Sequence, residues 1–115
     1  MPKLEGDDRT EFVSVLEQGV RFNGYVNYLE QARAGLDEHL GGWTQKGVTS
    51  ELVVYAKAGG KISRNEELRE HWQDFWRYCY HLWPVIGGTK LYFEARFSND
   101  DPDDQEIQIV NVHLP

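Results

Sequence analysis

Five polar residues recur at intervals of three or four along residues 67–81. They are Glu67, His71, Asp74, Tyr78 and His81. On a helix this spacing puts side chains on neighbouring turns of one face. A histidine beside a carboxylate can act as an oriented general base, and Glu, His and Asp together can ligate a divalent metal. Such spacing often arises by chance, and one helix usually supplies only two ligands, so the sequence favours a solvated helix face and predicts no metal site.

A second group of reactive side chains lies near the C-terminus. Tyr92 and Arg96 alternate on the polar side of a predicted strand, and His113 stands near the end of the next one. Arginine, tyrosine and histidine together can bind phosphate and shuttle protons, which suits a phosphodiester-cleaving site. Small bacterial ribonucleases with a helix–sheet layout carry sites of this kind, and the resemblance is limited to residue types and layout. Cross-strand pairs on a wet sheet face are the favoured interpretation.

The acidic loop at residues 98–104 has the composition of a calcium site but not its spacing. Its carboxylates belong to Asp100, Asp101, Asp103 and Asp104. Pro102 stands where an alternating ligand would be needed, and the glycine of an EF-hand loop is missing. A solvated turn is therefore expected, with carboxylates that can attract a basic partner.

Cys79 is the only cysteine, so the chain forms no internal disulfide and no cysteine-rich metal framework. It falls in the middle of an apolar stripe of the predicted helix over residues 63–83. We therefore expect a buried small hydrophobic residue rather than a nucleophile. No cofactor is predicted.

Aromatic residues are more plentiful than a narrow core contact needs. Trp72, Trp76, Tyr80 and Trp83 widen the apolar stripe of the predicted helix, and Trp43 stands in a loop. Trp and Tyr are enriched at protein interfaces and in ligand pockets. These five residues are the predicted binding surface.

The elements that position these groups begin with helices. Asp8 and Glu11 have capping-box spacing, and apolar residues then recur with helical periodicity over residues 12–20. β-branched residues in this segment leave a strand as the alternative. The pattern loosens over residues 19–24, where we expect a break, and a second helical stripe covers residues 26–40. Whether the two stripes form one helix or two stays open.

The middle of the chain predicts a strand followed by a helix. Residues 52–55 are short, β-prone and followed by two glycines, which favours a central strand. Ser63 and Glu66 form a second candidate capping box, and helical periodicity continues to Trp83, before Pro84. This helix would carry the polar row, Cys79 and most of the tryptophans.

A β-hairpin closes the chain. Residues 89–97 alternate between apolar and polar side chains, which predicts a strand with one buried face. Residues 106–114 return after the acidic loop, and their apolar phase shifts near Ile109 and Val110. The shift predicts a bulge there or a strand buried on both faces.

Together the elements predict one α+β domain over residues 1–115, with the order αα-β-α-ββ. The helices would pack on one face of a small, mainly antiparallel sheet. The 40% of hydrophobic residues and the chain length suit a single globular domain.

The net charge of −7 argues against general affinity for nucleic acid or anionic membranes and suits a basic partner. The N-terminal residues lack the apolar core of a signal peptide, and no apolar run is long enough to span a membrane, so a cytoplasmic location is expected.

The charge, the aromatic surplus and the lack of a catalytic motif favour a non-catalytic binding protein of the inhibitor or immunity type. It would contact a basic protein or a second copy of itself. A small-ligand binder with an aromatic-lined pocket beneath the predicted Trp-rich helix is the alternative. A small enzyme of the hydrolase or ribonuclease type ranks third.

Overall fold

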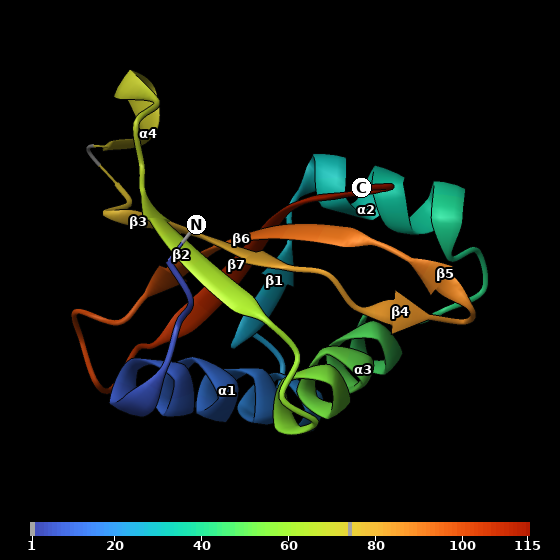
Figure 1. Ribbon diagram of the computed structural model, residues 1–115, viewed down its shortest axis with the longest axis horizontal. Coiled ribbons are helices and arrows are strands. Elements are labelled where there is room, and N and C mark those ends of the chain that lie inside the picture. Colours follow the sequence, from blue (N-terminus) through green and yellow to red (C-terminus); the bar gives the residue numbers. More distant parts are fainter. Residues whose placement is uncertain (1, 74) are drawn as a thin grey trace.

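In the computed structural model, which describes residues 2–73 and 75–115, a five-stranded sheet forms the centre of the molecule (Figure 1). The strand order is β1-β7-β6-β3-β2, and β4 and β5 form a separate two-stranded sheet. The elements are α1 Gly6–Arg21, β1 Val26–Tyr28, α2 Glu30–His39, α3 Gln45–Lys57, β2 Ile62–Glu66, α4 Glu70–Gln73, β3 Tyr78–Leu82, β4 Val85–Ile86, β5 Thr89–Lys90, β6 Tyr92–Ser98 and β7 Glu106–His113.

The predicted α+β class is confirmed. In the large sheet β1 pairs with β7 in parallel, and the β2–β3, β3–β6 and β6–β7 pairs are antiparallel. Helices α1 and α3 pack together beneath the sheet, and α2 lies against β7 (Figure 1). A Cβ at Gly35 of α2 would meet the Val112 carbonyl oxygen at 1.9 Å, so only glycine allows this close approach. No helix among the described residues is long and apolar enough to cross a membrane.

The first predicted helix is confirmed, but its predicted cap is wrong. Helix α1 begins at Gly6, and Glu5 is its N-cap without a side-chain hydrogen bond, so Asp8 and Glu11 lie inside the helix and form no capping box. The expected break follows Arg21. The second helix starts at Glu30 rather than residue 26, because residues 26–28 pair with β7 instead.

The predicted strand at residues 52–55 is wrong, because these residues lie in α3. The Thr44 hydroxyl caps this helix by accepting a hydrogen bond from the Gly47 backbone N–H at 2.9 Å. Val48, Leu52 and Ala56 are spaced four residues apart and all are buried. That helical spacing outweighs the β-propensity of the run from residue 52 to 55.

The long helix predicted over residues 63–83 is also wrong. Residues 62–66 and 78–82 are instead strands β2 and β3, paired in register from Ile62–Leu82 to Glu66–Tyr78. Ser63 and Glu66 therefore lie within a strand and not at the start of a helix. The connecting residues 67–73 and 75–77, here called the arm, contain the single turn α4 and project from the body (Figure 1). Along β3 the side chains alternate, and Tyr80 and Leu82 enter the core.

The predicted C-terminal hairpin is confirmed as β6 and β7. Glu94 pairs with Asn111 and Ala95 pairs with Ile109, which leaves Val110 as the extra residue of a bulge. The bulge lies where the apolar phase shifts. It brings Val112 back to the core side opposite Phe93.

Candidate functional site

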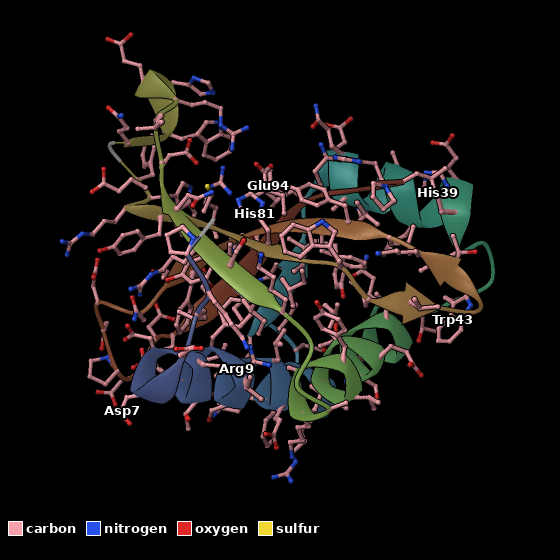
Figure 2. The ribbon with its side chains drawn as sticks, viewed as in Figure 1. Asp7, Arg9, His39, Trp43, His81 and Glu94 are labelled. Carbon is pink, nitrogen blue, oxygen red and sulfur yellow. The ribbon has the colours of Figure 1, made fainter. Side chains whose placement is uncertain are left out.

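The face of the sheet away from α1 and α3 carries polar and titratable side chains on its central strands. Cys79 and His81 project from β3, and Tyr92, Glu94 and Arg96 from β6. We call these five residues the open face. In Figure 2 the labelled His81 and Glu94 lie above the strands, on the opposite side from α1. The two residues are direct cross-strand partners.

His81 lies at the centre of a hydrogen-bonded chain. Its Nδ1 forms a short hydrogen bond with the Tyr92 hydroxyl, and its Nε2 lies 3.4 Å from the Cys79 Sγ. The His81 and Tyr92 rings also stack, with centroids 5.5 Å apart. The side chain is buried, so both ring nitrogens depend on these partners.

The environment keeps His81 neutral and Tyr92 protonated at neutral pH. Burial lowers the pKa of His81 below its usual value, and the nearby Glu94 carboxylate partly opposes this shift. Burial, reinforced by Glu94 and Cys79, raises the pKa of Tyr92 to about 12. A neutral imidazole can accept the proton of a neutral phenol. The proton on His81 then sits on Nε2, where the Cys79 sulfur accepts it.

Cys79 does not lie in the apolar core, contrary to the sequence prediction. Because the segment is a strand, Cys79 faces the same side as His81 and is half-buried. Burial and the carboxylates of Glu67 and Glu94 raise the pKa of its thiol. The thiol form is a poor nucleophile, so Cys79 acts here as a hydrogen-bond partner of His81.

Two arginines and two glutamates form a charge network beside His81. The Glu67 carboxylate is buried, forms an ion pair with Arg96 Nη2, and accepts a hydrogen bond from Arg69 Nε at 3.0 Å. Arg69 Nη2 donates to Glu94 Oε1 at 2.9 Å, and Arg96 Nη2 lies 3.6 Å from the same oxygen. Each buried charge is thereby compensated, as burial requires.

A recess of about 580 Å³ opens beside this network, and its lining includes Glu67, Arg69, Cys79, His81 and Glu94. The Arg69 side chain is 45% exposed, whereas the Arg96 side chain is fully buried. Arg69 is therefore the cation of the network that a ligand in the recess can reach.

The structure brings Tyr92 and His113 together, as the predicted phosphodiester-cleaving cluster of Tyr92, Arg96 and His113 requires. Their ring centroids are 4.7 Å apart, and His113 is exposed, with its Nδ1 within 2.7 Å of the Leu114 carbonyl oxygen. Arg96 shares the face, but its guanidinium is buried against Glu67 and cannot contact a phosphate. His81 takes a place in this cluster that the sequence did not indicate.

The polar row of residues 67–81 does not lie along one helix. His71 is exposed in the arm with its ring 5.5 Å from that of Trp72, and Tyr78 lies between Arg64 and Arg77. Asp74 lies outside the described residues. Across the rest of the chain, no group of three or more His, Cys, Asp or Glu side chains could hold a metal ion.

The five aromatic residues predicted as a binding surface do not form one patch. Tyr80 is buried in the core and stacks on Phe12 at 5.1 Å, so it is not available to a partner. Trp72 and Trp76 lie in the arm. The Trp72 ring covers Arg96 of β6, with its centroid 5.8 Å from the guanidinium carbon, and Trp76 is half-buried. Trp83 extends the open face beside Tyr92. Trp43 is 40% exposed and lies beside the turn between β4 and β5 (Figure 2).

Sequence analysis missed Arg69 and Glu94 as members of the site. The alternation over residues 89–97 put Glu94 on the same face as Tyr92 and Arg96, which was a usable signal. Arg69 carried no such signal, because its position depends on the course of the arm. Comparison of the chain with protein-family models, curated proteins and solved structures finds no match, so the function has to be inferred from this geometry.

Proposed function

We propose that the protein is a small enzyme that cleaves RNA by general acid–base catalysis on the open face. The observation that carries the proposal is the hydrogen bond from the Tyr92 hydroxyl to a neutral His81 at the border of a recess of about 580 Å³. Titratable pairs with shifted pKa values beside a recess are characteristic of catalytic sites.

In the proposed reaction, the ribose 2′-hydroxyl attacks the adjacent phosphorus. Its proton passes to the Tyr92 oxygen while the Tyr92 proton passes to His81 Nδ1. The new O2′–P bond forms as the P–O5′ bond breaks, and the protonated imidazole of His113 donates a proton to the leaving O5′. The products are a 2′,3′-cyclic phosphate and a free 5′-hydroxyl, and solvent then restores both histidines.

The charge network supports this chemistry. His81 becomes positive when it accepts the proton, and the adjacent Glu94 carboxylate favours that charged form. Arg69 is the exposed cation within reach of the phosphate. Cys79 keeps the proton on Nε2, which leaves the lone pair of Nδ1 directed at Tyr92.

The negative net charge does not oppose an RNA substrate as strongly as the sequence suggested. Acidic residues of α1, such as Asp7, lie across the sheet from His81 (Figure 2). On the open face the carboxylates of Glu67 and Glu94 are neutralised by arginines. The face therefore presents aromatic rings with little net charge, which suits an unpaired strand whose bases can stack.

The proposal is tested by incubating the protein with single-stranded RNA and identifying the products by mass spectrometry. We expect cyclic-phosphate ends from the wild type and a rate loss of about 10²- to 10⁴-fold for His81→Asn. Tyr92→Phe should reduce the cleavage rate by a comparable factor, because the proton transfer to His81 passes through the Tyr92 hydroxyl. His39→Asn on α2 (Figure 2) and Tyr25→Phe, whose ring lies beside Phe22, are matched controls outside the open face.

Cleavage that is unchanged in both the His81 and Tyr92 variants would rule out this site, and the activity would then come from a contaminating nuclease or from another part of the protein. Rescue of the His81→Asn rate by added imidazole would specifically support a proton-accepting role, since a purely structural role would not respond.

We also propose that the protein binds a protein partner through its arm. Leu68 and Phe75 are 78% and 76% exposed, which is unusual for large apolar side chains so close together in the sequence. Trp72 and Trp76 lie in the same arm, as the binding-protein hypothesis expects of its surface. Apolar and aromatic residues of this kind form the centres of protein interfaces.

This second proposal is tested by light scattering after size-exclusion chromatography, with wild type and the double variant Leu68→Ser/Phe75→Ser. A dimer that becomes a monomer in the variant supports self-association through the arm. A wild-type monomer leaves a different protein as the partner, which is sought by affinity capture with the same variant as control. Capture or dimerisation that is identical for both forms would overturn the assignment to the arm.

A further inference from the structure

A second recess lies next to the proposed catalytic group. It has a volume of about 430 Å³ and is lined by Tyr55, Lys61, Trp83 and Lys90. Trp83 links it to the open face, since its ring centroid is 5.8 Å from that of Tyr92 and 6.2 Å from that of His81. The recess therefore continues the aromatic row of the open face.

Hydrogen bonds fix the Tyr55 ring and the backbone at Trp83, which provide two walls of this recess. The Tyr55 hydroxyl donates to the Lys61 carbonyl oxygen at 2.5 Å and accepts from the Trp83 backbone N–H at 3.3 Å. Tyr55 comes from α3, whereas Trp83 follows β3, so one phenol ties a helix to the end of the strand. The Tyr55 ring and the backbone that carries Trp83 are thus held in place before any ligand arrives.

The third wall is the short hairpin of β4 and β5. Gly87 and Gly88 form its two-residue turn with φ of 59° and 82°, a conformation that favours glycine at both positions. The turn pairs Lys90 with Val85, and Leu91 N–H donates to the Pro84 carbonyl oxygen at 2.9 Å. Lys90 is thereby brought back beside Trp83.

Two exposed ammonium groups border the Trp83 ring. The Lys61 Nζ lies 5.7 Å from the ring centroid, and both Lys61 and Lys90 are exposed. Within residues 2–73 and 75–115, neither lysine forms an ion pair with a carboxylate. An aromatic ring beside two such cations suits a ligand that has both a flat ring and a negative charge.

We infer that this recess binds one nucleotide of the RNA substrate, adjacent to the bond that is cut. The base stacks on Trp83, and its phosphate lies between Lys61 and Lys90. The inference rests on the proposed function for the identity of the strand. It makes the recess the element that favours unpaired over paired RNA, because a base in a duplex cannot reach the Trp83 ring.

The test uses a short, fluorescently labelled, 2′-O-methyl RNA, which lacks the attacking hydroxyl and cannot be cleaved. Binding is followed by fluorescence anisotropy at several salt concentrations. Trp83→Leu should weaken binding by about 5- to 150-fold, the range for loss of one stacked base. The double variant Lys61→Gln/Lys90→Gln should reduce the slope of log K against log salt by about 0.7, the value for one phosphate of a single strand that loses its neutralising cations.

The matched control is Lys46→Gln/Lys57→Gln, which removes the same charge from α3. It should change neither the slope nor the affinity beyond a small general effect. If the Lys61/Lys90 variant behaves like this control, the nucleotide site is overturned, even if Trp83→Leu is misfolded. Equal affinity for free adenosine monophosphate and for the RNA would overturn the assignment to the RNA substrate, because the recess would then be a site for free nucleotides.

The binding assay and the RNA cleavage assay together separate the two proposals. If the wild type cleaves RNA but the Lys61→Gln/Lys90→Gln variant binds RNA as the wild type does, the acid–base site is retained and the nucleotide site is rejected. If the Trp83 and lysine variants weaken RNA binding as expected but the wild type does not cleave RNA with free 2′-hydroxyls, the nucleotide site is retained and the proposed catalysis is rejected.

Discussion

The two faces of the sheet at strands β3 and β6 differ completely in chemistry, although the side chains of both faces come from the same two strands. On the side of α1 and α3, Tyr80, Leu82, Phe93 and Ala95 are buried in a continuous apolar core. On the other side, Cys79, His81, Tyr92, Glu94 and Arg96 form hydrogen bonds and ion pairs. The two-residue period of a strand separates these sets without any change in fold.

This difference indicates a division of roles. Burial of apolar area on the core face supplies stability in rough proportion to area. The open face buries charges, which gives little net stability even when the charges are well paired. Buried charges that add little stability and are gathered beside a recess are best explained by a function.

The largest effect is expected when the core face is broken. Phe93→Ala should lower the free energy of unfolding by about 3–5 kcal/mol, since Phe93 is fully buried. Chemical denaturation measures this loss. The rate of RNA cleavage per folded molecule should stay near that of the wild type. A large drop in that rate without loss of stability would contradict the proposal that the core face supplies stability and the open face supplies catalysis.

A somewhat smaller effect is expected for the buried charge of the open face. Glu67→Gln leaves the buried Arg96 with Glu94 at 3.6 Å as its ion-pair partner and with a hydrogen bond to the Ala95 carbonyl oxygen. It should lower the free energy of unfolding by about 3 kcal/mol. The exposed neighbour Glu66→Gln serves as control and should stay within about 0.5 kcal/mol of the wild type. Equal denaturation midpoints for both variants would mean that the network carries no buried charge.

The smallest effect is expected for the partner of His81. Cys79→Ala removes the acceptor of Nε2 and should slow cleavage by about 2- to 10-fold, in keeping with the loss of one modest hydrogen bond. Cys79→Ser should restore most of the rate, because its hydroxyl can also accept. Rates of RNA cleavage by the wild type, Cys79→Ala and Cys79→Ser measure this effect. If alkylation-sensitive activity disappears in Cys79→Ser as fully as in Cys79→Ala, the thiol is a nucleophile instead.

The sequence predicted much of the fold but little of the site, and the long segment 63–83 explains why. Its apolar residues match helical spacing over five turns, yet Leu68 and Phe75 of that stripe are exposed and Tyr80 and Leu82 are buried by strand alternation. Tertiary pairing with β6 decides between the two periods, and no local pattern reports it. The hairpin of β6 and β7 was predictable because its alternation and bulge are local.

The site suffered from the same error. With residues 63–83 as a helix, His81 was grouped with Asp74 and Glu67 rather than with Tyr92, its neighbour across the strand pair. The cluster of Tyr92, Arg96 and His113 was found from strand alternation alone. The recess at Trp83 could not be foreseen, because it depends on where α3 meets the end of β3.

The most direct test of the acid–base pair is the pH dependence of RNA cleavage. His81 acts as a base in its neutral form, and burial lowers its pKa, so the acidic limb of the profile should lie below the usual histidine value of about 6.5. The same sign applies to folding: the unfolded chain binds the proton more tightly, so the His81 contribution penalises folding at low pH and the penalty disappears as pH rises past about 6.5. An acidic limb below this value that is absent in His81→Asn would support the account. A limb at or above it, or one that His81→Asn leaves unchanged, would contradict the claim that His81 accepts the proton.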